Sequence, residues 1–164
     1  MPSFEITRIV DASVQRVFDV FTDIDNLGNY CKDIVKIEHL TAGPIAAGTK
    51  FKETRQVFGR ESTETLTVEE FDPPDHWAIS GEFGGMVFMT RFDLQPEGDG
   101  TRLIVRTTVK PTNPLAWIMS LFSPLFMGSM KKAMKRETDI FASVADGTWT
   151  DPDVEESDES ESAD

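Results

Sequence analysis

Hydrophobic and polar residues alternate along most of the chain between positions 34 and 109. Alternation at a period of two is typical of strands that bury one face. Gly, Pro and Asp residues separate the alternating runs at short intervals and predict tight turns. The pattern therefore predicts six consecutive strands in an antiparallel meander, with expected bounds 34–40, 50–58, 61–71, 77–83, 86–94 and 101–109.

One more strand and a short helical segment precede this meander. Residues 4–10 also alternate, and Ser13 then suits the N-cap of a helix over residues 13–23. The apolar positions of that helix follow the i, i+3, i+4, i+7 spacing of an amphipathic face. Asp, Asn and Gly residues over 23–29 favour a second, short helical turn before Tyr30.

A pattern of helical period follows the last strand and predicts one long helix from Leu115 to about Ala145. Pro124 should kink this helix or separate two helices, because proline lacks a backbone N–H and clashes with the preceding turn. The expected buried stripe consists of Ile118, Met119, Phe122, Phe126, Met130, Met134, Phe141 and Val144.

This order of elements predicts an α+β fold. A curved antiparallel sheet of about seven strands would wrap around the long C-terminal helix, with two short helices after the first strand. About 30 helical residues span roughly 45 Å, which is enough to cross such a sheet. A curved sheet and one helix leave a gap between them, and that gap is the natural place for a ligand.

Composition and charge fit one globular domain with an acidic end. The chain has 164 residues, of which 39% are hydrophobic and 27% charged. Residues 151–164 contain eight acidic residues, and without them the net charge of −13 falls to −5. We expect a folded domain over residues 1–147 and an acidic disordered tail over 148–164. The acidic surface disfavours nucleic-acid binding.

Neither targeting nor metal chemistry is indicated. The N-terminus lacks the features of a signal peptide, and the most apolar run, 114–127, is shorter than the roughly 20 residues that span a bilayer. We therefore expect a cytoplasmic protein. Cys31 is the single cysteine, and His39 and His76 fall at predicted surface positions, so no catalytic residue, metal or cofactor is expected.

Several short motifs resemble the SRPBCC superfamily, also called START-like or helix-grip proteins, and within it the polyketide cyclase/dehydrase group. They are Val17-Phe18 followed by Asp23 and Tyr30, Gly48 with Phe51, Gly59, the run 68–73 with Pro74, and the run 98–103. The resemblance covers about residues 3–145. It implies a deep apolar cavity that binds small molecules or lipids, but not one activity, because a fold hosts many functions.

Glu53 and Arg55 are the most informative polar residues. They share a strand face with Phe51, so they could form a polar floor that orients a ligand headgroup. A register shifted by one residue would leave both in water. Tyr30 could offer its hydroxyl at the cavity mouth or cap the core with its ring. The predicted ligand-binding residues are Tyr30, Phe51, Glu53, Arg55, Met86, Phe88, Phe92, Met119, Phe122, Phe126 and Met130.

These observations favour the binding or carriage of a hydrophobic small molecule, such as a lipid, an isoprenoid quinone or a polyketide-like aromatic, over catalysis. The alternative is a cyclase or dehydratase in which Glu53, Arg55 or Tyr30 positions a polyketide-like chain. A regulatory protein that uses the tail or the apolar helix is a third hypothesis. The stretch Trp117–Met127, followed by basic residues, would permit transient membrane contact or dimerisation, but we expect it to be buried. The oligomeric state is not predicted.

Overall fold

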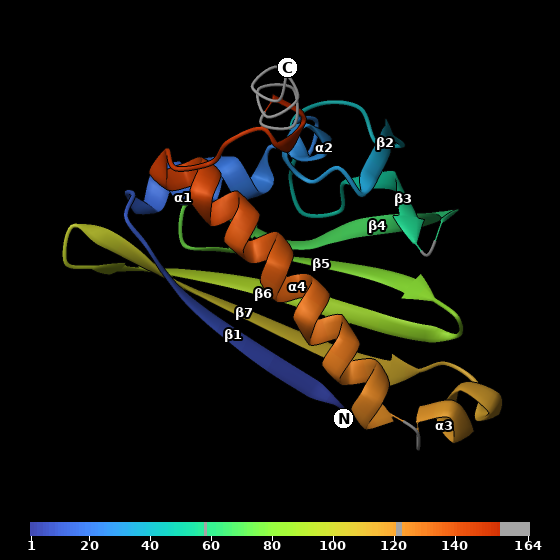
Figure 1. Cartoon of the computed structure of the whole chain (residues 1–164). Helices are drawn as coiled ribbons and strands as arrows, with labels where there is room; N and C mark the ends of the chain where they lie inside the picture. The colour runs from blue at the N-terminus through green and yellow to red at the C-terminus, as the bar shows by residue number, and fades with distance from the viewer. Residues whose placement is uncertain (58, 121–122, 155–164) are drawn as a thin grey trace, which may run out of the picture.

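A seven-stranded antiparallel sheet organises the fold in the computed structural model, which describes residues 1–57, 59–120 and 123–154 (Figure 1). The strand order is β1-β7-β6-β5-β4-β3-β2, so six strands form the expected meander and the first strand pairs with the last. The strands are β1 (Ser3–Val10), β2 (Ile34–His39), β3 (Lys50–Val57), β4 (Arg60–Asp72), β5 (His76–Phe83), β6 (Met86–Glu97) and β7 (Gly100–Pro111). The predicted fold class is confirmed.

Turn residues set the register of the sheet. Gly84 and Gly85 join β5 to β6 with φ angles of 59° and 76°, a left-handed conformation that two-residue hairpins require and that glycine adopts without strain. Val57 pairs with Arg60 across another tight turn, the one between β3 and β4. Register shifts between Val68 and Glu70 in β4, and in β2, add local bends of the kind that curve a sheet.

Four helices complete the described part of the chain, namely α1 (Val14–Thr22), α2 (Leu27–Tyr30), α3 (Pro114–Ser120) and α4 (Ser123–Asp146). Ser13 caps α1 as expected, since its side-chain oxygen accepts the backbone N–H of Arg16 at 3.2 Å. The C-terminal helical pattern forms two helices, α3 and α4, which is one of the two outcomes expected from Pro124. Pro124 is the second residue of α4, where the missing N–H of proline costs little. No helix in the described ranges has the length and apolarity needed to cross a membrane.

The long helix α4 crosses the concave side of the sheet diagonally (Figure 1). It contacts β1 along one edge and rests on α1 and α2. Phe21 of α1 joins the two layers, because its ring packs edge-on against Phe141 of α4 at 5.5 Å and contacts Phe92 of β6 at 5.8 Å. These contacts support α4 at its C-terminal end and leave space over the central strands.

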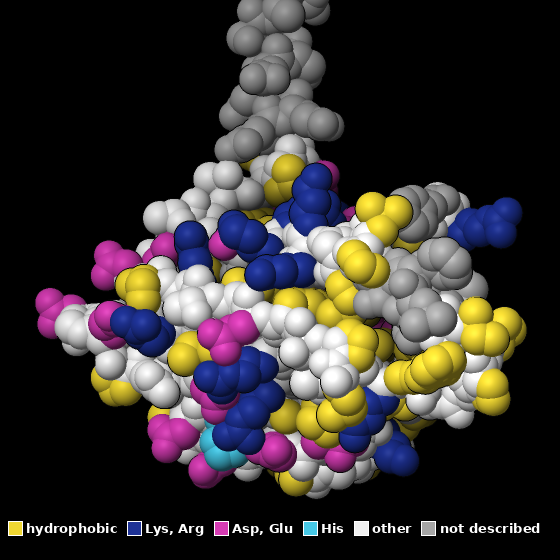
Figure 2. Space-filling view, turned by 90° about the horizontal axis from the view of Figure 1, so that it is seen from below, with side chains coloured by type: hydrophobic (Ala, Val, Ile, Leu, Met, Phe, Trp, Pro, Cys, Tyr) yellow, Lys and Arg dark blue, Asp and Glu magenta, His cyan; other side chains and the backbone are white. Residues whose placement is uncertain are grey.

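The expected burial of residues 117–127 is wrong for most of its described side chains. Trp117 is 59% exposed, Ile118 51% and Leu125 84%, so Ile118 does not belong to a buried stripe. Here α3 and the start of α4 lie at the end of the sheet (Figure 1), and α3 contacts the sheet mainly through β7 among the described elements. Figure 2 shows hydrophobic side chains gathered on this side of the molecule, with Lys and Arg side chains beside them.

The segment after α4 packs on the domain. The Trp149 ring contacts the Tyr30 ring edge-on at 5.1 Å, and Lys32 forms ion pairs with Asp151 and Asp153 at 3.5 and 3.1 Å. Trp149, Asp151 and Asp153, which follow the expected domain boundary at 147, therefore contact residues of the domain. The prediction of a disordered tail falls, from residue 155 onward, outside the described residues.

Candidate functional site

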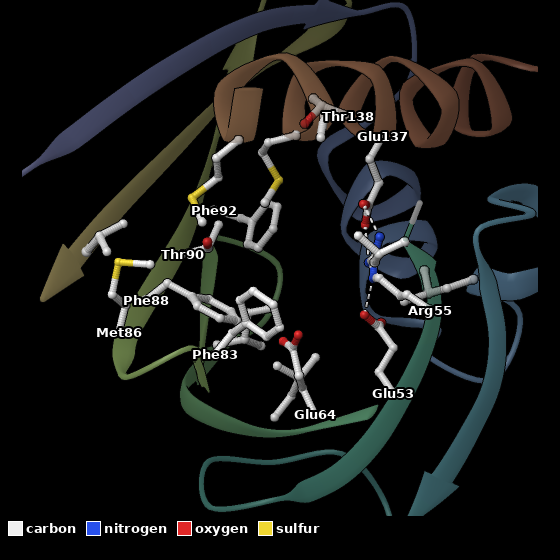
Figure 3. A pocket seen from close by; sticks show the side chains of 18 of the residues that line it. Glu53, Arg55, Glu64, Phe83, Met86, Phe88, Thr90, Phe92, Glu137 and Thr138 are labelled. Atoms are coloured by element: carbon white, nitrogen blue, oxygen red, sulfur yellow. Dashed lines mark hydrogen bonds and ion pairs between the residues drawn. The ribbon is translucent and has the colours of Figure 1, made fainter. Parts of the chain in front are cut away.

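A cavity of about 620 Å³ lies between α4 and the central strands of the sheet. Most of its wall is apolar, and the strands supply the larger share of it. Inward side chains at every second position of β3 and β6 line it, as the alternation predicted (Figure 3). On the helix side the lining positions of α4 include Met130, Met134, Glu137 and Phe141, which follow the i, i+4, i+7, i+11 spacing of one helical stripe.

One wall of the cavity carries an ion-paired column of three side chains (Figure 3). Arg55 of β3 donates from Nη1 and Nη2 to the two carboxylate oxygens of Glu137, at 2.8 and 3.0 Å. Its Nε donates to Oε1 of Glu53, two residues earlier on the same strand face. All three nitrogens of the guanidinium are therefore engaged by carboxylates, in the bidentate geometry that makes such pairs strong.

A third carboxyl group, that of Glu64, lies beside this column. Glu64 of β4 is directly opposite Glu53 in the sheet, and both line the cavity. Burial raises the pKa of Glu53 above its ordinary value, and Arg55 offsets only part of that effect. Burial and then the charge of Glu53 raise the pKa of Glu64, against smaller opposing effects of Arg55 and Ser62. Burial opposes the charge of Arg55, but Glu137 and Glu53 outweigh it and raise the pKa of the guanidinium.

Other polar atoms in the wall differ in how they are satisfied. Thr90 shares a hydrogen bond of 2.9 Å with Thr107, a buried residue of β7. Thr138 Oγ1 and Trp77 Nε1 have no hydrogen-bond partner among the described residues, although Thr138 is 1% and Trp77 3% exposed. Buried polar atoms are rarely left without a partner, so these two atoms are exceptions within the wall.

The structure brings most of the sequence-predicted residues together. The cavity wall includes Phe51, Glu53, Arg55, Met86, Phe88, Phe92, Phe126 and Met130. Glu53 and Arg55 face inward, so the register alternative that would have left them in water is wrong. Tyr30 does not line the cavity, because its ring packs against Trp149 at the other side of α2. Phe122 and the side chain of Met119 lie outside the described residues.

Sequence reasoning missed Glu64, Glu137 and Thr138. A signal for Glu64 was present, since the tight turn at Gly59 pairs Val57 with Arg60 and hence places Glu64 opposite Glu53. Glu137 follows the same helical stripe as Met130 and Met134, but it comes directly after the basic residues Lys135 and Arg136. Nothing local to the sequence shows that Glu137 meets Arg55, which lies 82 residues earlier.

The histidines and the cysteine lie outside the cavity wall. His39 pairs with Asp25 at 2.5 Å, and His76 lies 3.2 Å from Glu70. Burial raises the pKa of the Cys31 thiol, which keeps it protonated at neutral pH. Across the described ranges, no group of three or more His, Cys, Asp or Glu residues is arranged to hold a metal ion.

The chain matches one known protein family over most of its length. Residues 1–146 match the family described as polyketide cyclase/dehydrase and lipid transport. The chain belongs to this family. The resemblance deduced from the motifs is therefore confirmed, and family membership covers both ligand binding and polyketide cyclisation. No curated protein is significantly similar to the chain.

Solved structures agree on the fold. The crystal structure of Ara h 8.0201 superposes with a TM-score of 0.71 at 16% identity, over 88% of this chain and 97% of that one. TTHA0849 from Thermus thermophilus gives 0.63 at 19% identity, over 87% and 99%. The di-domain ARO/CYC protein StfQ from the steffimycin biosynthetic pathway gives 0.71 at 12% identity, over 89% of this chain and 49% of its own. At these low sequence identities, the superpositions show a shared fold and nothing about function.

Proposed function

We propose that this member of the family binds and carries a hydrophobic small molecule, such as a lipid, an isoprenoid quinone or a polyketide-like aromatic. The observation that carries the proposal is the cavity under α4, because about 620 Å³ of mostly apolar space is the size typical of small-molecule sites. Apolar burial would supply the driving force, at about 0.8 kcal/mol per methylene group. Affinity for a series of linear alcohols should therefore rise about fourfold per added methylene until the cavity is filled.

Blocking the cavity is the direct test. Ala133 lines the cavity from α4 but is exposed at its outer side, so tryptophan can be accommodated there without disturbing the core. We expect Ala133→Trp to weaken binding of 1-octanol and 1-decanol at least tenfold, measured by isothermal titration calorimetry. Its free energy of unfolding should stay within about 1 kcal/mol of wild type.

Lys132→Trp is the matched control, because it adds the same ring one residue earlier at an exposed position outside the cavity wall. It should leave both affinities unchanged. Equal affinities of the Ala133→Trp and Lys132→Trp variants would contradict binding in this cavity.

The cavity entrance supports exchange of the ligand with a membrane. Leu125, Phe126, Val57 and Phe83 all line the cavity and are all exposed, from 37% to 84%. Lys131 and Lys132 are exposed on the next turns of α4. An apolar rim beside lysines suits an anionic bilayer surface, which attracts each nearby Lys by about 1 kcal/mol.

Leu125→Glu should therefore reduce binding to vesicles that contain anionic phospholipid about tenfold, as measured by co-sedimentation. The change removes one inserted apolar side chain and adds a charge that the surface repels. It should not alter stability, because Leu125 is 84% exposed. Leu40→Glu, at a 49% exposed position outside the cavity wall, is the control. An equal loss in both variants would rule out a specific entrance contact.

A second candidate function is that of a cyclase or dehydratase. The specific observation in its favour is the pair of carboxyl groups, Glu53 and Glu64, whose raised pKa values inside an apolar cavity suit general acid–base chemistry. Arg55 contributes less than the sequence suggested, because its three nitrogens are already bound to carboxylates. Turnover of an aromatic polyketide-like substrate that Glu53→Gln abolishes, with binding retained, would favour this function over carriage.

A further inference from the structure

Charge in the cavity wall is unbalanced. Three carboxyl groups line it, those of Glu53, Glu64 and Glu137, and Arg55 is the one cation among the described lining residues. The guanidinium satisfies Glu137 with two hydrogen bonds and Glu53 with one. Glu64 takes no part in this column. It lies directly across the β3–β4 pairing from Glu53, and like charges in that position destabilise a sheet.

Hydrogen-bonding capacity is unbalanced in the same direction. An ionised carboxyl group only accepts hydrogen bonds, and three of the five N–H groups of Arg55 already donate to Glu53 or Glu137. Thr138, the residue after Glu137, adds a hydroxyl oxygen that is almost completely buried, lines the cavity and has no partner among the described residues. Figure 3 shows Glu64 pointing into the cavity from the sheet and Thr138 on the cavity side of α4. The three carboxyl groups thus offer more acceptor positions than the two remaining N–H groups of Arg55 and the Thr138 hydroxyl can fill.

An anionic headgroup does not fit this arrangement. A fatty-acid carboxylate would bring a fourth negative charge to a wall with one guanidinium, which already pairs with Glu53 and Glu137. A neutral hydroxyl would be tolerated but would add no positive charge to a wall with three carboxyl groups and one guanidinium. A protonated amine supplies both the positive charge and up to three N–H donors.

We propose that the polar end of the cavity recognises a protonated amine on an apolar body, with Glu64 as its counterion and with Glu53 as a further acceptor. This inference rests on the proposed function, since it names the headgroup of the ligand that the cavity holds. Arg55 then has a positioning role, because it holds Glu53 and Glu137 in place.

Three ligands of equal chain length test the proposal: octylamine, 1-octanol and octanoate, each titrated calorimetrically at pH 7. Octylamine should bind at least tenfold more tightly than 1-octanol, because a charge-assisted hydrogen bond is worth roughly that factor or more. Octanoate should bind more weakly than 1-octanol. Octanoate binding as tightly as octylamine would overturn the proposal.

Glu64→Gln isolates the counterion. It should weaken octylamine binding roughly tenfold and leave 1-octanol within about twofold of wild type. Glu61→Gln removes the same charge from an exposed position of the same strand and should change neither affinity, which excludes general attraction of the amine to an acidic surface. An equal loss of octylamine and 1-octanol in Glu64→Gln would overturn the counterion role.

The Glu64→Gln variant is expected to fold. The raised pKa of Glu64 means that its ionisation disfavours the folded state, so Glu64→Gln should be at least as stable as wild type at pH 7. This gain in stability should vanish below pH 4.5, the ordinary pKa of a glutamate.

If none of the three ligands binds, the proposed carrier function fails. If 1-octanol binds and octylamine gains nothing over it, only the amine inference fails.

Discussion

Replacing Arg55 with methionine is expected to lower the free energy of unfolding by about 3 kcal/mol, the lower end of the range for a buried ion pair that loses one partner. The side chains of Glu53 and Glu137 are only 9% and 19% exposed, and Arg55 is the cation that both of them contact. Methionine keeps most of the volume but leaves two carboxylates facing each other in an apolar wall. Urea denaturation followed by circular dichroism would measure the loss.

Arg106→Met is the matched control. Arg106 also bridges two carboxylates, Glu5 and Asp93, but its side chain is 50% exposed. When the guanidinium is removed, Asp93 keeps its ion pair with Arg91 and water solvates Glu5, which is 51% exposed, so the loss should stay below about 1 kcal/mol. A combined Arg55→Met, Glu53→Gln and Glu137→Gln variant should recover much of the lost stability, because it removes the uncompensated charges as well. A wild-type free energy of unfolding in Arg55→Met alone would contradict this account.

The deficit of Arg55→Met should also depend on pH. In wild type, Arg55 offsets part of the burial effect that raises the pKa of Glu53; without it, that pKa rises further. A carboxyl group with a raised pKa in the folded state favours folding below its unfolded value, and this contribution is lost as the pH rises through the folded value. The deficit relative to wild type should therefore be larger at pH 7 than near pH 4, where the carboxyl groups of both states take up protons.

Phe92→Ala is expected to cost about 3–5 kcal/mol of folding free energy. Phe92 is 6% exposed, stacks on Trp77 at 5.1 Å and contacts Phe21 at 5.8 Å, so it connects the cavity wall to the core under α1. Removing the ring takes away its buried area and leaves an empty volume that the neighbouring rings cannot fill without moving. Thermal unfolding by differential scanning calorimetry would measure the change.

Phe83→Ala provides the comparison, because Phe83 lines the same cavity but is 47% exposed at the entrance. Its removal should cost less than about 1 kcal/mol. The two variants separate the structural part of the wall from the part at the entrance. A similar loss for both would mean that Phe92 is not part of the core that holds the sheet and α4 together.

Much of the cavity followed from local pattern. The period of a strand is set by backbone geometry, so alternation alone places Phe51, Glu53 and Arg55 on one face. The same argument applies to Met86, Phe88 and Phe92 on β6. Turn residues such as Gly84-Gly85 make the connections short, and short connections between antiparallel strands leave one register and one sheet order.

The C-terminal region shows where local pattern stops being informative. An apolar stripe states which face of a helix prefers to be covered, but whether a cover exists depends on the length and curvature of the sheet beneath it. The stripe is buried at Phe141, where α1 and β6 lie opposite, and exposed at Ile118, which lies at the end of the sheet. Trp149, assigned to a tail by the composition around it, is held by the ring of Tyr30.

The sequence by itself determined the order of elements, the inward faces of the strands and the family, because these depend on periodicity and turn chemistry between near neighbours. Tertiary structure decided the chemistry of the cavity. Arg55 pairs with Glu137, which lies on a helix 82 residues later in the chain, and Thr138 of the same helix is buried without a partner among the described residues. Such pairings depend on the distance and angle between distant elements, and no local period encodes them.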